Sequence, residues 1–212
     1  MHSSFVNPIT AVCFIEYTKK YGHKAFVHGA AASSLGKMVL RYAKTQNVPV
    51  INIVRREEQE KDLKDLGAEY IINSSNESWK SELKELVEKT GASAYFDPIG
   101  GDFTGQVLEC LPAESHAYVY GALSGKPIVL NPLTFLFGQK HVSYLWLGPW
   151  LKSLNEEERN NVFGTIVKDL SSGGEIFSTS IHKSFPIADF EAAIENQSKN
   201  ASKGKTVIKP HD

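Results

Sequence analysis

The sequence is poor in cysteine and in net charge. Its 212 residues include only 2 Cys, and 23 Lys and Arg oppose 24 Asp and Glu, for a formal net charge of −1 at pH 7. A disulfide-stapled scaffold uses many more cysteines, and a nucleic-acid partner favours a strongly basic chain. Cys13 and Cys110 stand outside any CxxC or Cys/His cluster, which favours free buried thiols over a disulfide or a metal site. We therefore expect small molecules or other proteins as partners, with no metal and no nucleic acid.

Membrane-spanning and targeting signals are also lacking. No apolar run approaches the ~20 residues that cross a bilayer, and no basic stretch followed by an apolar one opens the chain. We expect no membrane partner and a cytoplasmic protein, with a mitochondrial location open if a natural N-terminal segment is missing. The composition, 42% hydrophobic and 22% charged, is that of an ordinary globular chain. Its length fits one large domain, or one domain and a fragment.

Helical and strand patterns alternate along most of the chain. Asn7 is expected to cap a helix over 7–21 with Pro8 as its first residue. The expected strands are 24–28, 49–54, 70–73, 94–97, 117–120 and 142–147, and the later expected helices are 34–43, 57–66, 79–90, 103–111 and 156–170. Short apolar strands separated by helices imply parallel βαβ units with helices on both sheet faces. The sequence therefore predicts a doubly wound α/β, Rossmann-like domain over residues 1–178.

The expected strand 142–147, the expected helix 156–170 and the C-terminal tail each show a distinct pattern. The apolar residues of 142–147 face both ways, which favours a covered edge strand. Asn155 followed by Glu158 indicates a helix start that turns apolar residues such as Val162 and Val167 inward. The tail is strand-like, then helical, then strand-like, and we expect residues 179–212 to form a short C-terminal appendage.

The turn after the first expected strand carries the most informative pattern. Residues 28–36 read HGAAASSLG, and such small side chains let backbone N–H groups approach a pyrophosphate at the positive end of a helix. Residues 24–54 have roughly the ~30-residue span of a dinucleotide fingerprint, although Ala or Ser replaces its early glycines. The predicted pyrophosphate contacts are Ser33, Ser34, Leu35 and Gly36.

The residues that follow the second expected strand favour one nicotinamide cofactor. NAD sites usually place an Asp or Glu there, on the ribose 2′-hydroxyl, whereas this chain has Arg55 and Arg56. A guanidinium group binds a phosphate bidentately, so the pair favours NADPH over NADH. The alternative is that both arginines are solvated and pair with acidic residues at 57, 58 and 60 of the next helix.

The same turn also resembles a nucleophile elbow, in which Ser34 would be the nucleophile of a hydrolase. Hydrolases of that fold normally have several strands ahead of the elbow, whereas one helix and one strand precede this turn. The later histidines, His182 and His211, lie in the tail without an Asp placed by a strand end. The cofactor interpretation is therefore favoured.

Two later turns fall at the carboxyl edge of the predicted sheet, where ligands bind in such folds. Asp97 with Gly100 and Gly101 forms one, and residues 121–125 form the other, so the nicotinamide is expected there. The glycines could equally serve turn geometry alone. The histidines at 28, 116 and 141 are expected to be structural, and the aromatic residues within 135–150 to form core or a subunit interface.

Several segments together resemble the medium-chain dehydrogenase/reductase superfamily, in its zinc-free quinone oxidoreductase and enoyl reductase branch. They are NPITA at 7–11, AAASSLG at 30–36, LGAE at 66–69, FDPIGG at 96–101 and GKTVIKP at 204–210. The resemblance covers essentially the whole chain in order. One departure is Ser33, which stands where the family has Gly.

The resemblance implies an NADPH-dependent oxidoreductase that transfers hydride to a quinone or an α,β-unsaturated carbonyl. It implies that Gly121, Ala122 and Leu123 contact the nicotinamide, with Thr10 reaching toward it, and that two chains pair through the edge 142–147. Family members begin with a GroES-like catalytic domain of more than about a hundred residues, to which 179–212 would belong. The chain alone is then expected to be catalytically incomplete, and no catalytic residue is assigned. The alternative is a non-enzymatic scaffold or an NADPH-sensing subunit.

Overall fold

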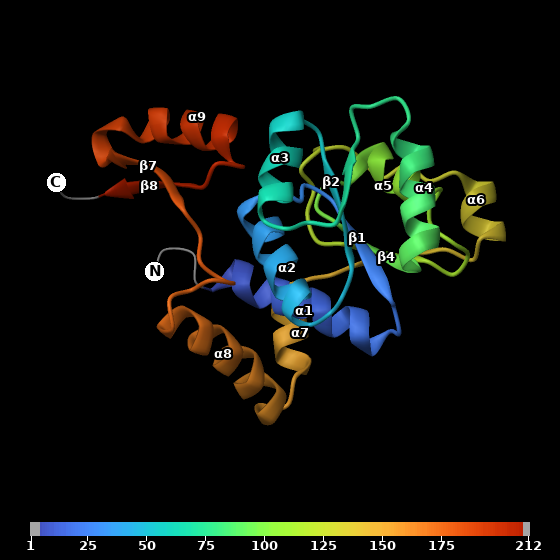
Figure 1. The fold of residues 1–212 in the computed structure, drawn as a ribbon, viewed down its shortest axis with the longest axis horizontal. Helices are drawn as coiled ribbons and strands as arrows, with labels where there is room; N and C mark the ends of the chain where they lie inside the picture. Colours follow the sequence, from blue (N-terminus) through green and yellow to red (C-terminus); the bar gives the residue numbers. More distant parts are fainter. Residues whose placement is uncertain (1–4, 210–212) are drawn as a thin grey trace.

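The computed structural model describes residues 5–209, built around a parallel sheet of six strands in the order β3-β2-β1-β4-β5-β6 (Figure 1). The strands are β1 (Ala25–His28), β2 (Val50–Val54), β3 (Tyr70–Asn73), β4 (Ala92–Asp97), β5 (His116–Val119) and β6 (His141–Tyr144). The chain moves outward from β1 to β3 and then returns to start β4 on the other side of β1. This order confirms the predicted doubly wound fold and leaves a crevice position beside the carboxyl ends of β1 and β4.

Helices cover both faces of the sheet. They are α1 (Val6–Lys20), α2 (Ser34–Thr45), α3 (Glu57–Asp65), α4 (Trp79–Thr90), α5 (Gly101–Leu108), α6 (Pro132–Phe137), α7 (Leu147–Ser153) and α8 (Glu156–Ser171). One buried cluster joins α1, α2 and α8 to the sheet through residues such as Phe14, Met38 and Ile166. A second joins α4 and α5 to its other face through residues such as Leu83 and Val107. The central strands β1 and β2 are buried throughout, as parallel strands covered on both faces must be.

The predicted start of the first helix was wrong. Phe5 occupies the N-cap position without a side-chain hydrogen bond, and the helix begins at Val6, so Asn7 lies inside the first turn. The run from Pro8 to Ile15 is almost wholly buried against α2 and the sheet. Packing therefore outweighs the local capping preference of Asn7. Gly22, at φ 72°, follows the helix as predicted.

The region after β5 was predicted less well. Asn155 and Glu158 do form a reciprocal capping box at the start of α8. Only one stripe of α8 faces the core, however, because Val162 and Ile166 are buried while Val167 is 62% exposed. The inward orientation predicted for Val167 was therefore wrong. The short helices α6 and α7, each with a proline in its first turn, were not predicted.

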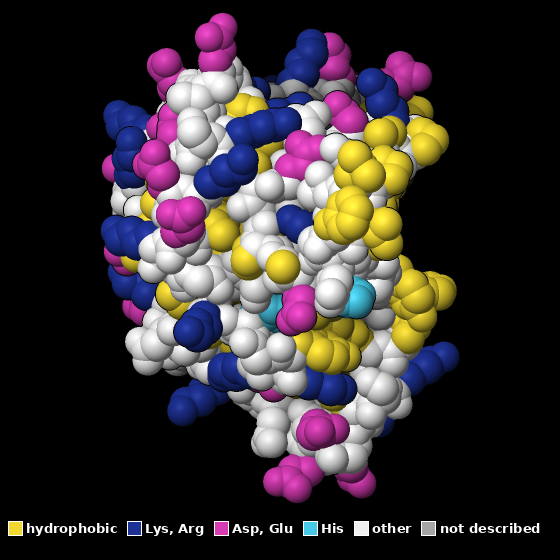
Figure 2. Space-filling model, turned by 90° about the vertical axis from the view of Figure 1, so that its right-hand side faces the viewer, with side chains coloured by type: hydrophobic (Ala, Val, Ile, Leu, Met, Phe, Trp, Pro, Cys, Tyr) yellow, Lys and Arg dark blue, Asp and Glu magenta, His cyan; other side chains and the backbone are white. Residues whose placement is uncertain are grey.

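Within 5–209 no strand covers the outer edge of β6, and the expected cover by a second chain stays a prediction. It pairs with β5 alone. Tyr144 at its end and Trp146 just after it are 75% and 70% exposed, and Leu147 already belongs to α7. On α6, Leu136 and Phe137 are also exposed. Figure 2 shows hydrophobic side chains gathered along one margin of the side that carries α6.

The appendage forms a small unit beside α3 (Figure 1). It consists of β7 (Ile181–Pro186), the single-turn helix η1 (Ile187–Asp189), α9 (Phe190–Asn200) and β8 (Lys205–Lys209), with β7 and β8 paired in parallel. The division of the chain at 178/179 stays a prediction, and His211 and Pro210 lie outside the described residues. No helix within 5–209 is long and apolar enough to cross a membrane.

Candidate functional site

The turn between β1 and α2 is shaped by close backbone packing. An added Cβ at Gly36 would lie 2.1 Å from the carbonyl oxygen of Ala31, so only glycine lets the helix approach the turn this closely. Ala30 adopts a left-handed conformation at φ 49°. The turn thus has the tight bend and the close helix approach of a dinucleotide fingerprint, although it has glycine only at its start, Gly29, and at its end, Gly36.

The predicted pyrophosphate contacts divide into two groups. Ser33 is the N-cap of α2, and its hydroxyl oxygen accepts a hydrogen bond of 3.1 Å from the Gly36 N–H. The Ser33 hydroxyl oxygen and the Gly36 N–H are therefore already paired with each other at the start of α2. Ser34 and Leu35 occupy the first two helical positions, whose N–H groups have no acceptor within a helix. No acidic residue lies in this first turn, so the helix start favours an anion.

The carboxyl end of β2 brings Arg55 and Arg56 to the surface. Arg56 Nε lies 3.3 Å from Glu58 Oε1, and its Nη2 donates a hydrogen bond of 3.4 Å to Ser202 Oγ of the appendage. The backbone N–H of Arg55 donates to Gln59 Oε1. The predicted alternative, pairing with the acidic residues of α3, is therefore present for Arg56. An exposed pair of this kind contributes only about 0–1 kcal/mol to stability.

Asp97 at the end of β4 is a structural residue. It is fully buried, and its carboxylate accepts hydrogen bonds from the Tyr95 hydroxyl (2.9 Å) and the Thr104 hydroxyl (2.5 Å). It also accepts from the backbone N–H groups of Ile99 and Gly100, at 2.7 and 3.1 Å. Four donors leave its carboxylate no role toward a ligand, and Asp97 instead holds the turn that leads into α5.

The second turn at this edge, 121–125, is bonded to the first. The N–H of Leu123 donates to Pro98 O at 3.0 Å, and an added Cβ at Gly121 would lie 2.8 Å from the same oxygen. The two turns thereby form one ledge next to the end of β1, with the Leu123 side chain 73% exposed. Thr10 is buried on α1, and its hydroxyl donates to Val6 O at 2.7 Å within its own helix.

His28 lies beneath this ledge at the end of β1. Its Nε2 is 2.8 Å from the Tyr120 hydroxyl, it is fully buried, and its Nδ1 has no partner among the described residues. Burial lowers the pKa of His28 to about 3. A neutral, fully enclosed imidazole supports the predicted structural role. Ser34 forms no hydrogen bond to a histidine anywhere in 5–209, and that geometry gives no support to the hydrolase alternative.

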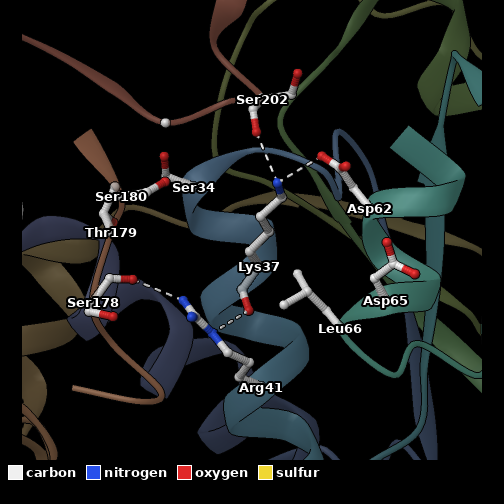
Figure 3. A pocket seen from close by; sticks show the side chains of 11 residues that line it. Ser34, Lys37, Arg41, Asp62, Asp65, Leu66, Ser178, Thr179, Ser180 and Ser202 are labelled. Carbon is white, nitrogen blue, oxygen red and sulfur yellow. Dashed lines mark hydrogen bonds and ion pairs between the residues drawn. The ribbon is translucent and has the colours of Figure 1, made fainter. Parts of the chain in front are cut away.

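A pocket of about 480 Å³ opens next to the start of α2, between α2, α3 and the appendage (Figure 3). Lys37 lies across it, with Nζ 3.1 Å from Asp62 Oδ2 and 2.9 Å from the Ser202 backbone oxygen. Arg41, one helical turn further along α2, donates to Ser178 O at 2.9 Å. These side chains were not predicted as site residues. Their spacing on the polar face of α2 was readable, but contacts to residues more than 130 positions away had no local signal.

Both the sequence and the fold of this chain are matched by known proteins. The sequence model of a family described as zinc-binding dehydrogenases matches residues 34–166. The chain belongs to this family. The predicted resemblance to medium-chain dehydrogenase/reductases is thereby confirmed. Within 5–209, no cluster of three or more His, Cys, Asp or Glu side chains is placed to hold a metal ion.

Individual relatives are reductases. A mitochondrial enoyl-[acyl-carrier-protein] reductase of Arabidopsis thaliana is 25% identical over 190 residues, which are 86% of this chain and 51% of the relative. A 2-haloacrylate reductase of a Burkholderia species is 24% identical over 95% of this chain and 60% of the relative. A crystal structure from Mesorhizobium loti, given the provisional name NADPH:quinone reductase, is 28% identical, with a TM-score of 0.86 over 98% of this chain and 59% of that one. The chain thus spans about half to three fifths of these relatives.

Proposed function

We propose that this chain is the NADPH-binding part of an oxidoreductase that reduces a quinone or an α,β-unsaturated carbonyl. The observation that carries the proposal is the pairing of an open, acid-free start of α2 with Arg55 and Arg56 at the end of β2. In this fold those two positions are the ones that meet the pyrophosphate and the adenosine ribose. The names of the relatives supply the substrate class, since enoyl, haloacrylate and quinone reductases all act on conjugated acceptors.

The chain's own residues bind and orient the cofactor. The N–H groups of Ser34 and Leu35 donate to the pyrophosphate, which the positive end of α2 also attracts. Arg55 and Arg56 bind the 2′-phosphate, and Gly121, Ala122 and Leu123 support the nicotinamide ring. The cofactor supplies the hydride. Thr10 stays a candidate near the nicotinamide, although its hydroxyl already donates to Val6.

No proton donor for the reduction is assigned to this chain. His28 is neutral and enclosed, and Asp97 is saturated with donors. Because the chain spans only part of its relatives, we propose that it binds NADPH but does not complete the reduction alone. Its place in the cytoplasm stays a prediction as well.

We also propose that two copies associate through β6 and α6. The edge strand offers unpaired backbone groups, and Tyr144, Trp146, Leu136 and Phe137 are exposed around it. A related reductase from Candida tropicalis is a heterodimer, which supports association in the family. A non-enzymatic scaffold or NADPH-sensing subunit would use the same surface.

The test is a thermal unfolding series with NADPH and with NADH. A ligand at about 100 times its Kd adds about 2.7 kcal/mol to the free energy of unfolding, so NADPH is expected to raise the unfolding temperature well above the effect of NADH. Assays with a simple quinone and a crotonyl thioester follow on the same sample. No shift with either cofactor would contradict the cofactor site, and turnover by the chain alone would contradict its incompleteness.

A further inference from the structure

The appendage contacts the proposed 2′-phosphate site directly. The turn 200–204 joins α9 to β8, and its Ser202 meets two cationic side chains of the main domain. Arg56 donates to the Ser202 hydroxyl at 3.4 Å, and Lys37 donates to the Ser202 backbone oxygen at 2.9 Å. Figure 3 shows Lys37 extending from α2 to both Ser202 and Asp62. One residue of the tail therefore connects the end of β2 with α2.

The turn is held in a fixed position. Gly204, at φ 138°, packs closely against Ser180, the residue before β7. An added Cβ at Gly204 would lie 2.6 Å from Ser180 O. The N–H of Lys205 donates to the same oxygen at 2.9 Å. The guanidinium of Arg41, on α2, donates a hydrogen bond to Ser178 O in the segment before β7. Ser202 is thus placed by contacts on both sides rather than carried on a free loop.

The chemistry around Ser202 suits a phosphate. A serine hydroxyl offers one donor and two acceptor sites. In 5–209 it accepts from Arg56 and is given no acceptor for its own hydrogen. A phosphate held by Arg56 would accept that hydrogen. Lys37 adds a second positive charge nearby, because its Nζ lies 2.9 Å from the Ser202 backbone oxygen. Glu58 and Asp62, which now pair with Arg56 and Lys37, are the acidic groups that a bound phosphate would have to compete with.

We infer that the turn 200–204 forms the third side of the 2′-phosphate site, with Ser202 donating its hydroxyl hydrogen to the phosphate. Lys37 is the positioning residue that holds the turn there. This inference rests on the proposed NADPH site and goes beyond it, because it assigns recognition of the 2′-phosphate to the tail as well as to β2. Discrimination between NADPH and NADH then depends on contacts between segments about 146 residues apart in the sequence.

The experiment compares Ser202→Ala with Ser198→Ala in the full chain, measuring the Kd of NADPH and of NADH by calorimetry. Ser198 is exposed on α9, and its hydroxyl only donates to Glu195 O of its own helix. Loss of one hydrogen bond to a charged group is expected to raise the NADPH Kd about tenfold in Ser202→Ala. The NADH Kd, and both values in Ser198→Ala, are expected to stay unchanged.

A second pair tests the positioning role. Lys37→Met is expected to raise the NADPH Kd and to speed hydrogen exchange in 200–204 of the free protein, and Lys37→Arg is expected to restore both. In the wild type, NADPH but not NADH is expected to slow exchange in this turn. An unchanged NADPH Kd in Ser202→Ala, or equal losses for both cofactors, would overturn the inference while leaving the NADPH site standing. Wild-type protein that binds neither cofactor would refute the proposed function and the inference with it.

Discussion

Gly36 and Ala31 approach each other so closely that no side chain fits between them. The Cβ of any other residue at Gly36 would lie 2.1 Å from the carbonyl oxygen of Ala31, well inside contact distance. The first turn of α2 is therefore set against the end of β1 by backbone contact. This contact places the N–H groups of Ser34 and Leu35 at the position that we propose for the pyrophosphate.

Gly36→Ala is expected to displace α2 and to destabilise the protein. Overpacking of this kind costs about 1–3 kcal/mol, and the same displacement is expected to weaken NADPH binding. Gly164→Ala on α8 is the matched control, because an added Cβ there meets nothing within 4 Å. That change is expected to be neutral or to stabilise by up to about 1 kcal/mol. Urea unfolding of both variants gives the comparison, and equal stabilities would contradict the close-packing account.

Glu58→Gln is expected to strengthen NADPH binding. Arg56 Nε now lies 3.3 Å from Glu58 Oε1, and this pair must open for Arg56 to bind the 2′-phosphate. Removing the competing charge is worth up to about 1 kcal/mol, or roughly fivefold in Kd. Glu157→Gln, an exposed change in the first turn of α8, is the control. Weaker NADPH binding in Glu58→Gln would show that Glu58 organises the site instead of competing for it.

The stability of the protein is expected to fall on mild acidification because His28 is buried in its neutral form. Burial lowers the pKa of His28 from 6.5 to about 3, so below pH 6.5 the unfolded chain binds a proton that the folded chain does not. The contribution of His28 to stability is therefore present above pH 6.5 and is lost as the pH falls toward 3. Between pH 7 and 5 the loss amounts to roughly 2 kcal/mol.

The measurement is the free energy of unfolding from pH 7 to 5 in His28→Gln and in the exposed control His182→Gln. His116 contributes in the same direction, since burial and the neighbouring His141 and His23 lower its pKa to about 4. The slope against pH is expected to be shallower in His28→Gln than in the wild type and in His182→Gln. Parallel slopes in all three proteins would contradict the assignment of a neutral His28.

Trp146→Glu is expected to convert a dimer into a monomer. Trp146 is 70% exposed beside the unpaired edge of β6, and a charge there opposes the burial of that surface. Ile194→Glu on α9, which changes a side chain that is 61% exposed, is the control. Sedimentation equilibrium of the three proteins tests the prediction. A monomeric wild type would refute association through this edge.

Much of the fold was readable because its signals are local. The strand at 70–73 and the helix at 79–90 were predicted to the residue, since each is bounded by glycine or polar turns and has one clear period. The capping box of Asn155 and Glu158 is likewise a short-range pattern. The start of α1 was missed because burial of the whole helix outweighed the cap preference of Asn7.

The strand-end positions of the proposed site residues could be read from the sequence, whereas the contacts between distant segments could not. Ser34, Leu35, Arg55 and Arg56 follow from their places after β1 and β2. The structural use of Asp97 could not be read from the sequence, because two of its donors come from β4 and α5 side chains, Tyr95 and Thr104. Lys37, Arg41 and Ser202 depend on how the appendage lies against α2, which no sequence period encodes.

The most direct test of the central claim is calorimetric titration of the full chain with NADPH and with NADH, repeated on the double variant Arg55→Ala, Arg56→Ala. The two cofactors differ only in the 2′-phosphate, and hydrogen bonds to charged groups contribute about 1.5–3 kcal/mol. We expect the wild type to bind NADPH at least about tenfold more tightly than NADH, and the double variant to lose that difference while still binding NADH. Equal binding of the two cofactors by the wild type, or binding of neither, would contradict the account.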